Sequence, residues 1–231
     1  MRSIRLLVAP LLLVTPLAAG CGHDPSVPAS AIAVVGDRTI PRADFDALMA
    51  QTKDSYTRSG KTFPAPRTPA YAELKDTAVR LLVERAELEQ KAPGLGVTVT
   101  DGQVDAQRTL LLEETFGGSE ATYRARLRAV GMTDAEVRSA LRAQLLSQAV
   151  FQAVTADVGV STDTVESYYE AHLKEYTSPA GRIVPFNQVR ETIRRRLLAD
   201  ARAAAFDRWL AGVRGEFARR TVYAEGFAPA K

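Results

Sequence analysis

The chain of 231 residues contains a single cysteine, Cys21. One thiol cannot form a disulfide within the chain, so the fold must be stabilised by its hydrophobic core. Hydrophobic residues make up 46% of the sequence, and a chain of about two hundred residues can bury a core without cross-links. These properties exclude the class of small, disulfide-stabilised secreted domains.

Cys21 ends an N-terminal segment that is organised like a secretory signal. Arginines precede an apolar stretch over residues 6–17, which is too short to span a bilayer, and small residues lead to the cysteine. The run Leu-Ala-Ala-Gly-Cys at positions 17–21 resembles the lipobox of bacterial lipoproteins. This resemblance implies removal of a signal peptide at residues 1–20, acylation of Cys21 by lipids such as palmitate, and anchoring to the outer face of the cell membrane or within the envelope. The alternative is an ordinary signal peptide that ends in a chance cysteine.

The charge balance argues against a nucleic-acid partner. Removal of the signal takes away Arg2 and Arg5 and no acidic residue, so the 30 basic side chains fall to 28 against 27 acidic ones. A nearly neutral exported chain has little attraction for a polyanion. We therefore expect no nucleic acid among its partners.

Residues 21–30 are expected to form the lipidated cysteine and a short polar tether, because prolines and polar residues dominate the segment. The fold is expected to begin at Ala31. The β-branched run over residues 32–40, which is broken at Gly36-Asp37, predicts a short strand and a tight turn. Pro41 is expected to open a helix, and the proline-rich stretch 58–69 predicts a loop.

Apolar residues recur at helical spacing over most of the remaining chain. The predicted helices cover residues 70–91, 101–116, 119–129, 133–156, 163–176 and 186–220. Thr100 with Gln103 and Thr133 with Glu136 fit capping boxes at two helix starts. The similar starts of three of these helices also allow a helical repeat array, although the limited chemistry of capping explains them without one.

The last predicted helix has the longest apolar stripe, which requires a partner surface. The stripe comprises Val189, Ile193, Leu197, Ala201, Ala205, Trp209, Val213 and Phe217. We expect Trp209 to be buried against the early helices, and residues 221–223 to pair as a strand with the N-terminal strand. The predicted fold is a single, mainly α domain over residues 31–231 with a very small antiparallel sheet, in which early and late helices pack together and the middle helices form a lobe.

Several of these segments resemble the SurA/PrsA-type family of extracytoplasmic chaperones and foldases. The likeness begins with the strand, turn and helix start at 33–45, and it continues through Tyr168-Tyr169 to the Pro-Phe start of the last helix. In foldase members, a parvulin-type prolyl isomerase domain of about a hundred residues precedes that last helix. Only the eight residues 177–184 occupy this place here. The resemblance implies a SurA N-terminal-like chaperone domain that binds unfolded or newly exported client proteins and lacks the isomerase.

No catalytic or metal-ligating constellation is visible in the sequence, so we expect no enzymatic activity, no cofactor and no metal site. The two histidines, His23 and His172, have no convergent partners. The helical glutamates are expected on solvated faces; they are Glu84, Glu87, Glu89, Glu113 and Glu114.

Two groups of side chains on the last helices have two interpretations each. The basic group is expected either to contact anionic lipid or an acidic client, or to form a solvated face with aliphatic stems on the core edge. The aromatic group could line a client groove or pack in the core. The basic group is Arg190, Arg194, Arg195, Arg196 and Arg202, and the aromatic group is Tyr168, Tyr169 and Tyr176.

At the level of function, the alternative is a non-catalytic lipoprotein that docks one dedicated envelope partner. A broad apolar cleft favours the chaperone, whereas a flat, defined patch favours the dedicated partner.

Overall fold

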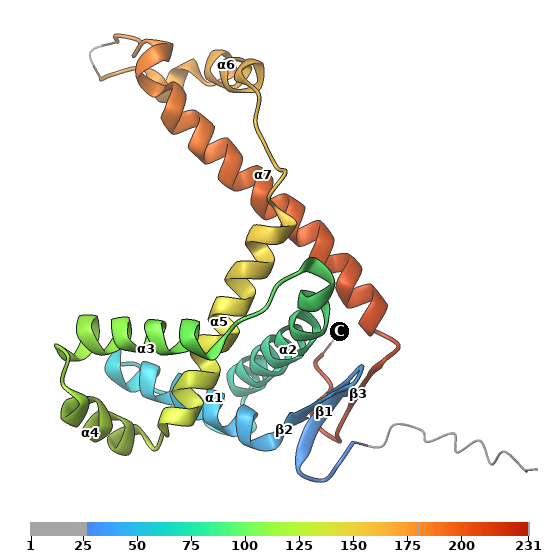
Figure 1. Cartoon of the computed structure of the whole chain (residues 1–231). Coiled ribbons are helices and arrows are strands. Elements are labelled where there is room, and N and C mark those ends of the chain that lie inside the picture. Colours follow the sequence, from blue (N-terminus) through green and yellow to red (C-terminus); the bar gives the residue numbers. More distant parts are fainter. Residues whose placement is uncertain (1–26, 180, 231) are drawn as a thin grey trace, which may run out of the picture.

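The computed structural model describes residues 27–179 and 181–230, so the signal segment, Cys21 and most of the tether lie outside the described residues. The described part contains seven α-helices and one three-stranded antiparallel sheet (Figure 1). The prediction of a mainly α fold with a very small sheet is confirmed. None of the helices in this part is long and apolar enough to cross a bilayer.

The sheet joins the two ends of the described chain. Its central strand is β1 (Ala31–Val35), which pairs antiparallel with β2 (Arg38–Pro41) on one side and with β3 (Thr221–Tyr223) on the other. The predicted pairing of the C-terminal strand with the N-terminal one is therefore confirmed.

Three helices and the sheet enclose the larger hydrophobic core. They are α1 (Arg42–Arg58), α2 (Pro69–Lys91) and the C-terminal half of α7 (Phe186–Phe217). Early and late helices thus pack together, as predicted. We call this unit the body; its fully buried side chains include Ile32, Val35, Val79 and Val213.

The turn between β1 and β2 is held by two helices of the body. Gly36 has φ of +54°, and a Cβ atom at this position would lie 2.8 Å from the Phe217 ring. The Gln90 side chain accepts a hydrogen bond from the Asp37 N–H at 3.0 Å and donates one to the Val35 carbonyl at 2.8 Å. Glycine is required because the turn needs a left-handed residue with no side chain.

The helices α3 (Asp101–Phe116), α4 (Glu120–Val130) and α5 (Asp134–Val154) form a middle lobe (Figure 1). Both predicted capping boxes are present at the starts of α3 and α5, with reciprocal bonds between the threonine and the residue three positions on. A smaller core cluster connects α5 to α2 and α7 through Leu88, Ala92, Val150 and Leu210.

Trp209 packs against both core clusters but is only partly buried. Its ring stacks on Phe206 at the junction of the two clusters, with 5.6 Å between centroids. The prediction of a buried Trp209 is therefore right about its neighbours and wrong about its degree of burial. The next residue, Leu210, is the one that is buried.

The helix α6 (Thr162–Ala171) and the N-terminal half of α7 form an arm that extends from the rest of the molecule (Figure 1). At 1.5 Å per residue, the 32 residues of α7 span roughly 48 Å. The apolar stripe of α7 therefore packs against two different regions, α6 and the body. Ile193 is buried in the half that contacts α6, and Val213 and Phe217 are buried in the body.

The predicted helix over residues 163–176 is interrupted in the structure. The α-helix ends at Ala171, and a 3₁₀ turn covers Leu173–Tyr176. Tyr169 contacts both Tyr176 and Phe186, at centroid distances of 5.5 and 5.3 Å. The change of helix type coincides with this aromatic contact between α6 and the start of α7. Because the contact joins residues that are distant in sequence, helical periodicity does not predict it.

Candidate functional site

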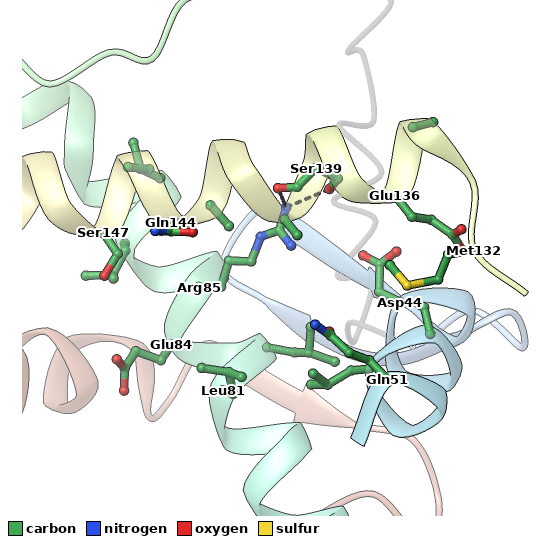
Figure 2. A pocket seen from close by; sticks show the side chains of 18 residues that line it. Asp44, Gln51, Leu81, Glu84, Arg85, Met132, Glu136, Ser139, Gln144 and Ser147 are labelled. Carbon is green, nitrogen blue, oxygen red and sulfur yellow. Dashed lines mark hydrogen bonds between the residues drawn. The ribbon is translucent and has the colours of Figure 1, made fainter. Parts of the chain in front are cut away.

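A groove of about 510 Å³ lies between α1, α2 and α5, along the seam between the body and the middle lobe (Figure 2). Most of the side chains that line it are apolar: Ala47, Leu48, Leu81, Leu82, Leu88, Met132, Ala135, Ala140, Ala143 and Leu146. Leu81, which is 54% exposed, adds to this continuous apolar surface. An open, apolar concavity of this size is a candidate binding site.

The sequence of α5 explains why the groove is open. Ala135, Ser139, Ala143 and Ser147 follow one another at intervals of four residues and line the groove. Residues at this spacing share one helix face, and side chains this small leave the space to the facing helix unfilled. The groove is therefore built into the helix pairing.

Arg85 connects the two sides of the groove. Its guanidinium donates hydrogen bonds to the Ser139 hydroxyl at 2.9 Å and to the Ser139 carbonyl at 3.2 Å, and its Nε lies 3.1 Å from a Glu89 carboxylate oxygen. Figure 2 shows Arg85 reaching from α2 to α5. The polar bridge supports the groove while leaving its apolar wall exposed.

A network of charged side chains holds the middle lobe together. The Arg108 guanidinium bonds Asp134 at 2.6 Å and Glu120 at 2.8 Å, and the buried Tyr123 hydroxyl donates to Asp134 at 2.9 Å. Burial raises the pKa of Tyr123 to about 12, with a further contribution from the Asp134 hydrogen bond. For Asp134 itself, burial is outweighed by the bonds from Arg108 and Tyr123, and its pKa is lowered.

An ion pair between α4 and α1 also ties the lobe to the body. Arg126 on α4 reaches Asp54 on α1, with its Nη2 at 3.1 and 2.9 Å from the two carboxylate oxygens. Neither residue lines the groove, so this pair joins the lobe to the body at a separate place.

The structure places the two residue groups left open by the sequence in the arm, away from the groove. Tyr169 and Tyr176 contact one another, and Tyr168 stacks on His172 with 3.9 Å between centroids. Arg196 lies over the Tyr168 ring and forms an ion pair with Glu175 at 3.2 Å. These contacts favour packing within the arm over a client groove for the tyrosines.

The basic stretch of α7 is mostly solvent-exposed, in agreement with a solvated face. Arg190, Arg194, Arg195 and Arg196 are exposed, whereas Arg202 is partly buried and its Nε has no hydrogen-bond partner among the described residues. Arg202 is thus less exposed than the other four arginines of the group.

Glu87 is buried, so its expected place on a solvated face is wrong. Only 4% of it is exposed, and its Oε2 has no hydrogen-bond partner within the described part of the chain. Burial raises its pKa, while the nearby Arg214 charge opposes that shift. Glu87 follows the buried Val79 and Val83 at intervals of four, a signal that could have identified its inward face.

The groove residues themselves were not identified from the sequence. A usable signal existed in two places: the small residues at four-residue spacing on α5, and the adjacent residues Leu81 and Leu82, which do not share one helix face. These residues form a groove only because α1, α2 and α5 pack together, and this packing is a property of the tertiary structure.

The eight residues 177–184, which lie between the 3₁₀ turn and the start of α7, are closed into a hairpin. Thr177 and Ile183 form an antiparallel bridge, the Ser178 N–H donates to the Arg182 carbonyl at 2.8 Å, and the Tyr169 hydroxyl donates to the Val184 carbonyl at 2.8 Å.

Across residues 27–179 and 181–230, no three histidine, cysteine, aspartate or glutamate side chains gather as a group that could hold a metal ion.

Comparison with known proteins agrees with this architecture. The profile of the SurA-like N-terminal domain matches residues 1–151. The foldase protein PrsA of Clostridium acetobutylicum is 23% identical over 158 residues, which cover 62% of this chain and 45% of the relative. The foldase protein PrsA of Clostridium tetani is 23% identical over 179 residues, which cover 72% of this chain and 52% of the relative. The chain thus spans about half the length of these curated relatives. It belongs to the SurA-like N-terminal domain family, of the SurA/PrsA type.

Proposed function

We propose that this protein is a membrane-anchored, extracytoplasmic chaperone that holds apolar segments of unfolded or newly exported proteins in the groove between α1, α2 and α5. The observation that carries the proposal is the open apolar groove with an exposed Leu81 at its wall. The foldase names of the two relatives support a role in protein folding.

The composition of the groove suits a binder that accepts many sequences. Leucine, alanine and methionine side chains present apolar surface without demanding a specific hydrogen-bond pattern. A concave groove at a seam also fits an extended or helical segment better than the flat face of a folded partner. These features favour the chaperone over the dedicated-partner alternative.

We further propose that the protein has no prolyl isomerase activity. The hairpin at 177–184 occupies the position of the isomerase domain in the resembled foldases and is too short to form a domain. The purified protein is expected to leave the isomerisation rate of an X-Pro peptide at its uncatalysed value. An accelerated rate that a point substitution in this chain abolishes would overturn this proposal.

Lipidation of Cys21 is the proposed means of membrane attachment. Two or three acyl chains anchor firmly, because each buried methylene contributes roughly 0.8 kcal/mol. Cys21→Ala is expected to release the exported protein from the membrane fraction or to block processing of the precursor. Unchanged processing and retention would contradict lipidation.

The holding function is tested by aggregation of several denatured model proteins with and without this protein, in the absence of ATP. We expect delayed aggregation at near-stoichiometric ratios, and a weaker delay for Leu81→Gln. Leu110→Gln is the matched control, since Leu110 is an exposed leucine (47%) on α3 outside the groove. Both variants should keep the melting temperature, because both leucines are exposed.

Unchanged aggregation of every model protein, together with tight binding of one native envelope protein, would replace the proposal with the dedicated-partner function. An equal loss of activity in Leu81→Gln and Leu110→Gln would instead remove the groove as the binding site.

A further inference from the structure

The groove has an uneven distribution of charge along its length. Its charged lining residues are three acids, Asp44, Glu84 and Glu136, and one base, Arg85. Figure 2 shows Asp44 and Glu136 near Met132 at one end, and Glu84 toward the opposite end. The lining is therefore acidic overall, and the two ends can be compared through the partners of each carboxylate.

At the Glu84 end, the charge is largely balanced within the protein. The Arg214 guanidinium lies 2.7 Å from a Glu84 carboxylate oxygen. The single base of the lining, Arg85, is likewise paired with Glu89. These contacts leave little net charge for a bound segment to meet at this end.

At the opposite end, no basic side chain of the described residues forms an ion pair with the groove carboxylates. Asp44 forms no ion pair with any residue of the described chain and is exposed. Glu136 uses one oxygen, Oε2, to accept from the Thr133 N–H at 2.6 Å and the Thr133 hydroxyl at 2.8 Å. Its bonds with Thr133 lower its pKa, so Glu136 carries its charge at neutral pH.

The arginines that follow Glu136 on α5 are engaged elsewhere. Arg138 pairs with Asp105 at 2.5 Å, and Arg142 pairs with Asp101, so both reach toward α3. Neither side chain neutralises the carboxylates at the Met132 end of the groove.

We infer that the groove selects, among apolar segments, those that carry lysine or arginine at one end, with the basic side chain placed beside Asp44 and Glu136. This inference rests on the proposed function, because it needs a client segment in the groove. The apolar wall binds the hydrophobic residues, and the acidic end adds affinity and fixes the orientation of the segment. Segments that end in acidic residues are disfavoured by like-charge repulsion.

The test measures binding of three fluorescent peptides to the full chain by anisotropy. The peptides share one leucine- and alanine-rich core and end in two lysines, two serines or two glutamates. We expect the lysine peptide to bind about threefold to tenfold more tightly than the serine peptide, since each exposed ion pair contributes modestly. The glutamate peptide should bind more weakly than both, and the differences should shrink at high salt.

The double variant Asp44→Asn/Glu136→Gln removes the two charges and is expected to abolish the preference for lysine while still binding the serine peptide. Glutamine at position 136 can keep the helix cap, because Gln103 completes the equivalent box with Thr100 in α3. The control Asp46→Asn/Glu113→Gln removes the same number of exposed charges outside the groove lining and should retain the preference.

Equal affinities for the three peptides, or a preference that persists in the Asp44/Glu136 variant, would overturn the inference and leave the holding function intact. Binding of none of the peptides, with no delay of aggregation, would overturn the holding function and the inference with it.

Discussion

The body and the middle lobe are stabilised by different interactions, although both are built mainly of helices. The body buries fourteen apolar residues in one cluster that includes strands, α1, α2 and α7. In the lobe, the buried side chains Val104, Tyr123, Leu127 and Leu141 are supplemented by the ion pairs of Arg108. An apolar core resists separation of its elements, whereas partly exposed ion pairs contribute less each, because water competes for the charged groups. The groove lies where these two kinds of structure meet.

The two regions are also expected to respond to acid in opposite directions. Asp134 and Glu120 in the lobe have lowered pKa values, Asp134 because the bonds from Arg108 and Tyr123 outweigh burial and Glu120 because of the bonds from Arg108. Their contribution to stability is present above the unfolded pKa and is lost as the pH falls through the folded pKa. Glu87 in the body has a pKa raised by burial, so its destabilising effect is relieved as the pH falls.

The largest effect is expected from the core of the body. Phe217→Ala should lower the free energy of unfolding by about 3 to 5 kcal/mol, because a buried ring is lost from the contact of α7 with the sheet. Phe116→Ala is the counterpart in the lobe, where the ring is partly buried against Tyr123, and should cost less than half as much. Thermal and urea unfolding measure both; equal losses would show that the lobe has an apolar core as important as that of the body.

The second effect concerns the ion-pair network of the lobe. Arg108→Met should cost about 1 to 2 kcal/mol, since Asp134 and Glu120 lose a partner but these carboxylates remain partly hydrated. Hydrogen exchange should increase in α3 to α5 and stay unchanged in α2 and the sheet. Arg124→Met, which removes an exposed pair with the same Glu120, is the control and should have little effect. Faster exchange throughout the body would contradict the independence of the two regions.

The smallest effect is a gain in stability at Glu87. Glu87→Gln should raise the free energy of unfolding by about 1 kcal/mol at pH 7, because a buried charge is replaced by a neutral side chain. The gain should vanish below about pH 4.3, where the wild-type carboxyl is protonated in both folded and unfolded states. Urea unfolding from pH 3 to 8 measures this dependence. A gain that is constant with pH would mean that the pKa of Glu87 is the same in the folded and unfolded states, and that burial does not penalise its charge.

Local signals in the sequence were sufficient for most of the secondary structure. Thr100 and Thr133 begin helices through capping boxes, and Gly36 lies in the turn between two strands. These features depend on residues within a few positions of one another, so the sequence contains all of the interacting groups. The pairing of β3 with β1 was also predictable, because a short strand at each end of a helical chain has few other partners.

The burial of individual apolar and charged side chains could not be predicted from the sequence. The α7 stripe reads as continuous, but it is divided between the arm and the body, and Trp209 lies at the junction of two clusters. The sequence suggests that Glu87 is a helical surface residue. In the structure, Arg214 on α7 opposes the rise in the Glu87 pKa, while burial and the Glu87 charge raise the pKa of Tyr223 on β3. Burial is a property of elements far apart in the chain.

The sequence by itself determined the mainly α class, the helix starts, the small sheet and the resemblance to the SurA/PrsA type, because capping, turns and hydrophobic period act over short distances. Only the tertiary structure decided where a client could bind. Leu81 on α2 and the small residues of α5 are separated by more than fifty positions, and they become one groove only because Arg85 and the neighbouring cores hold the helices together without filling the space between them.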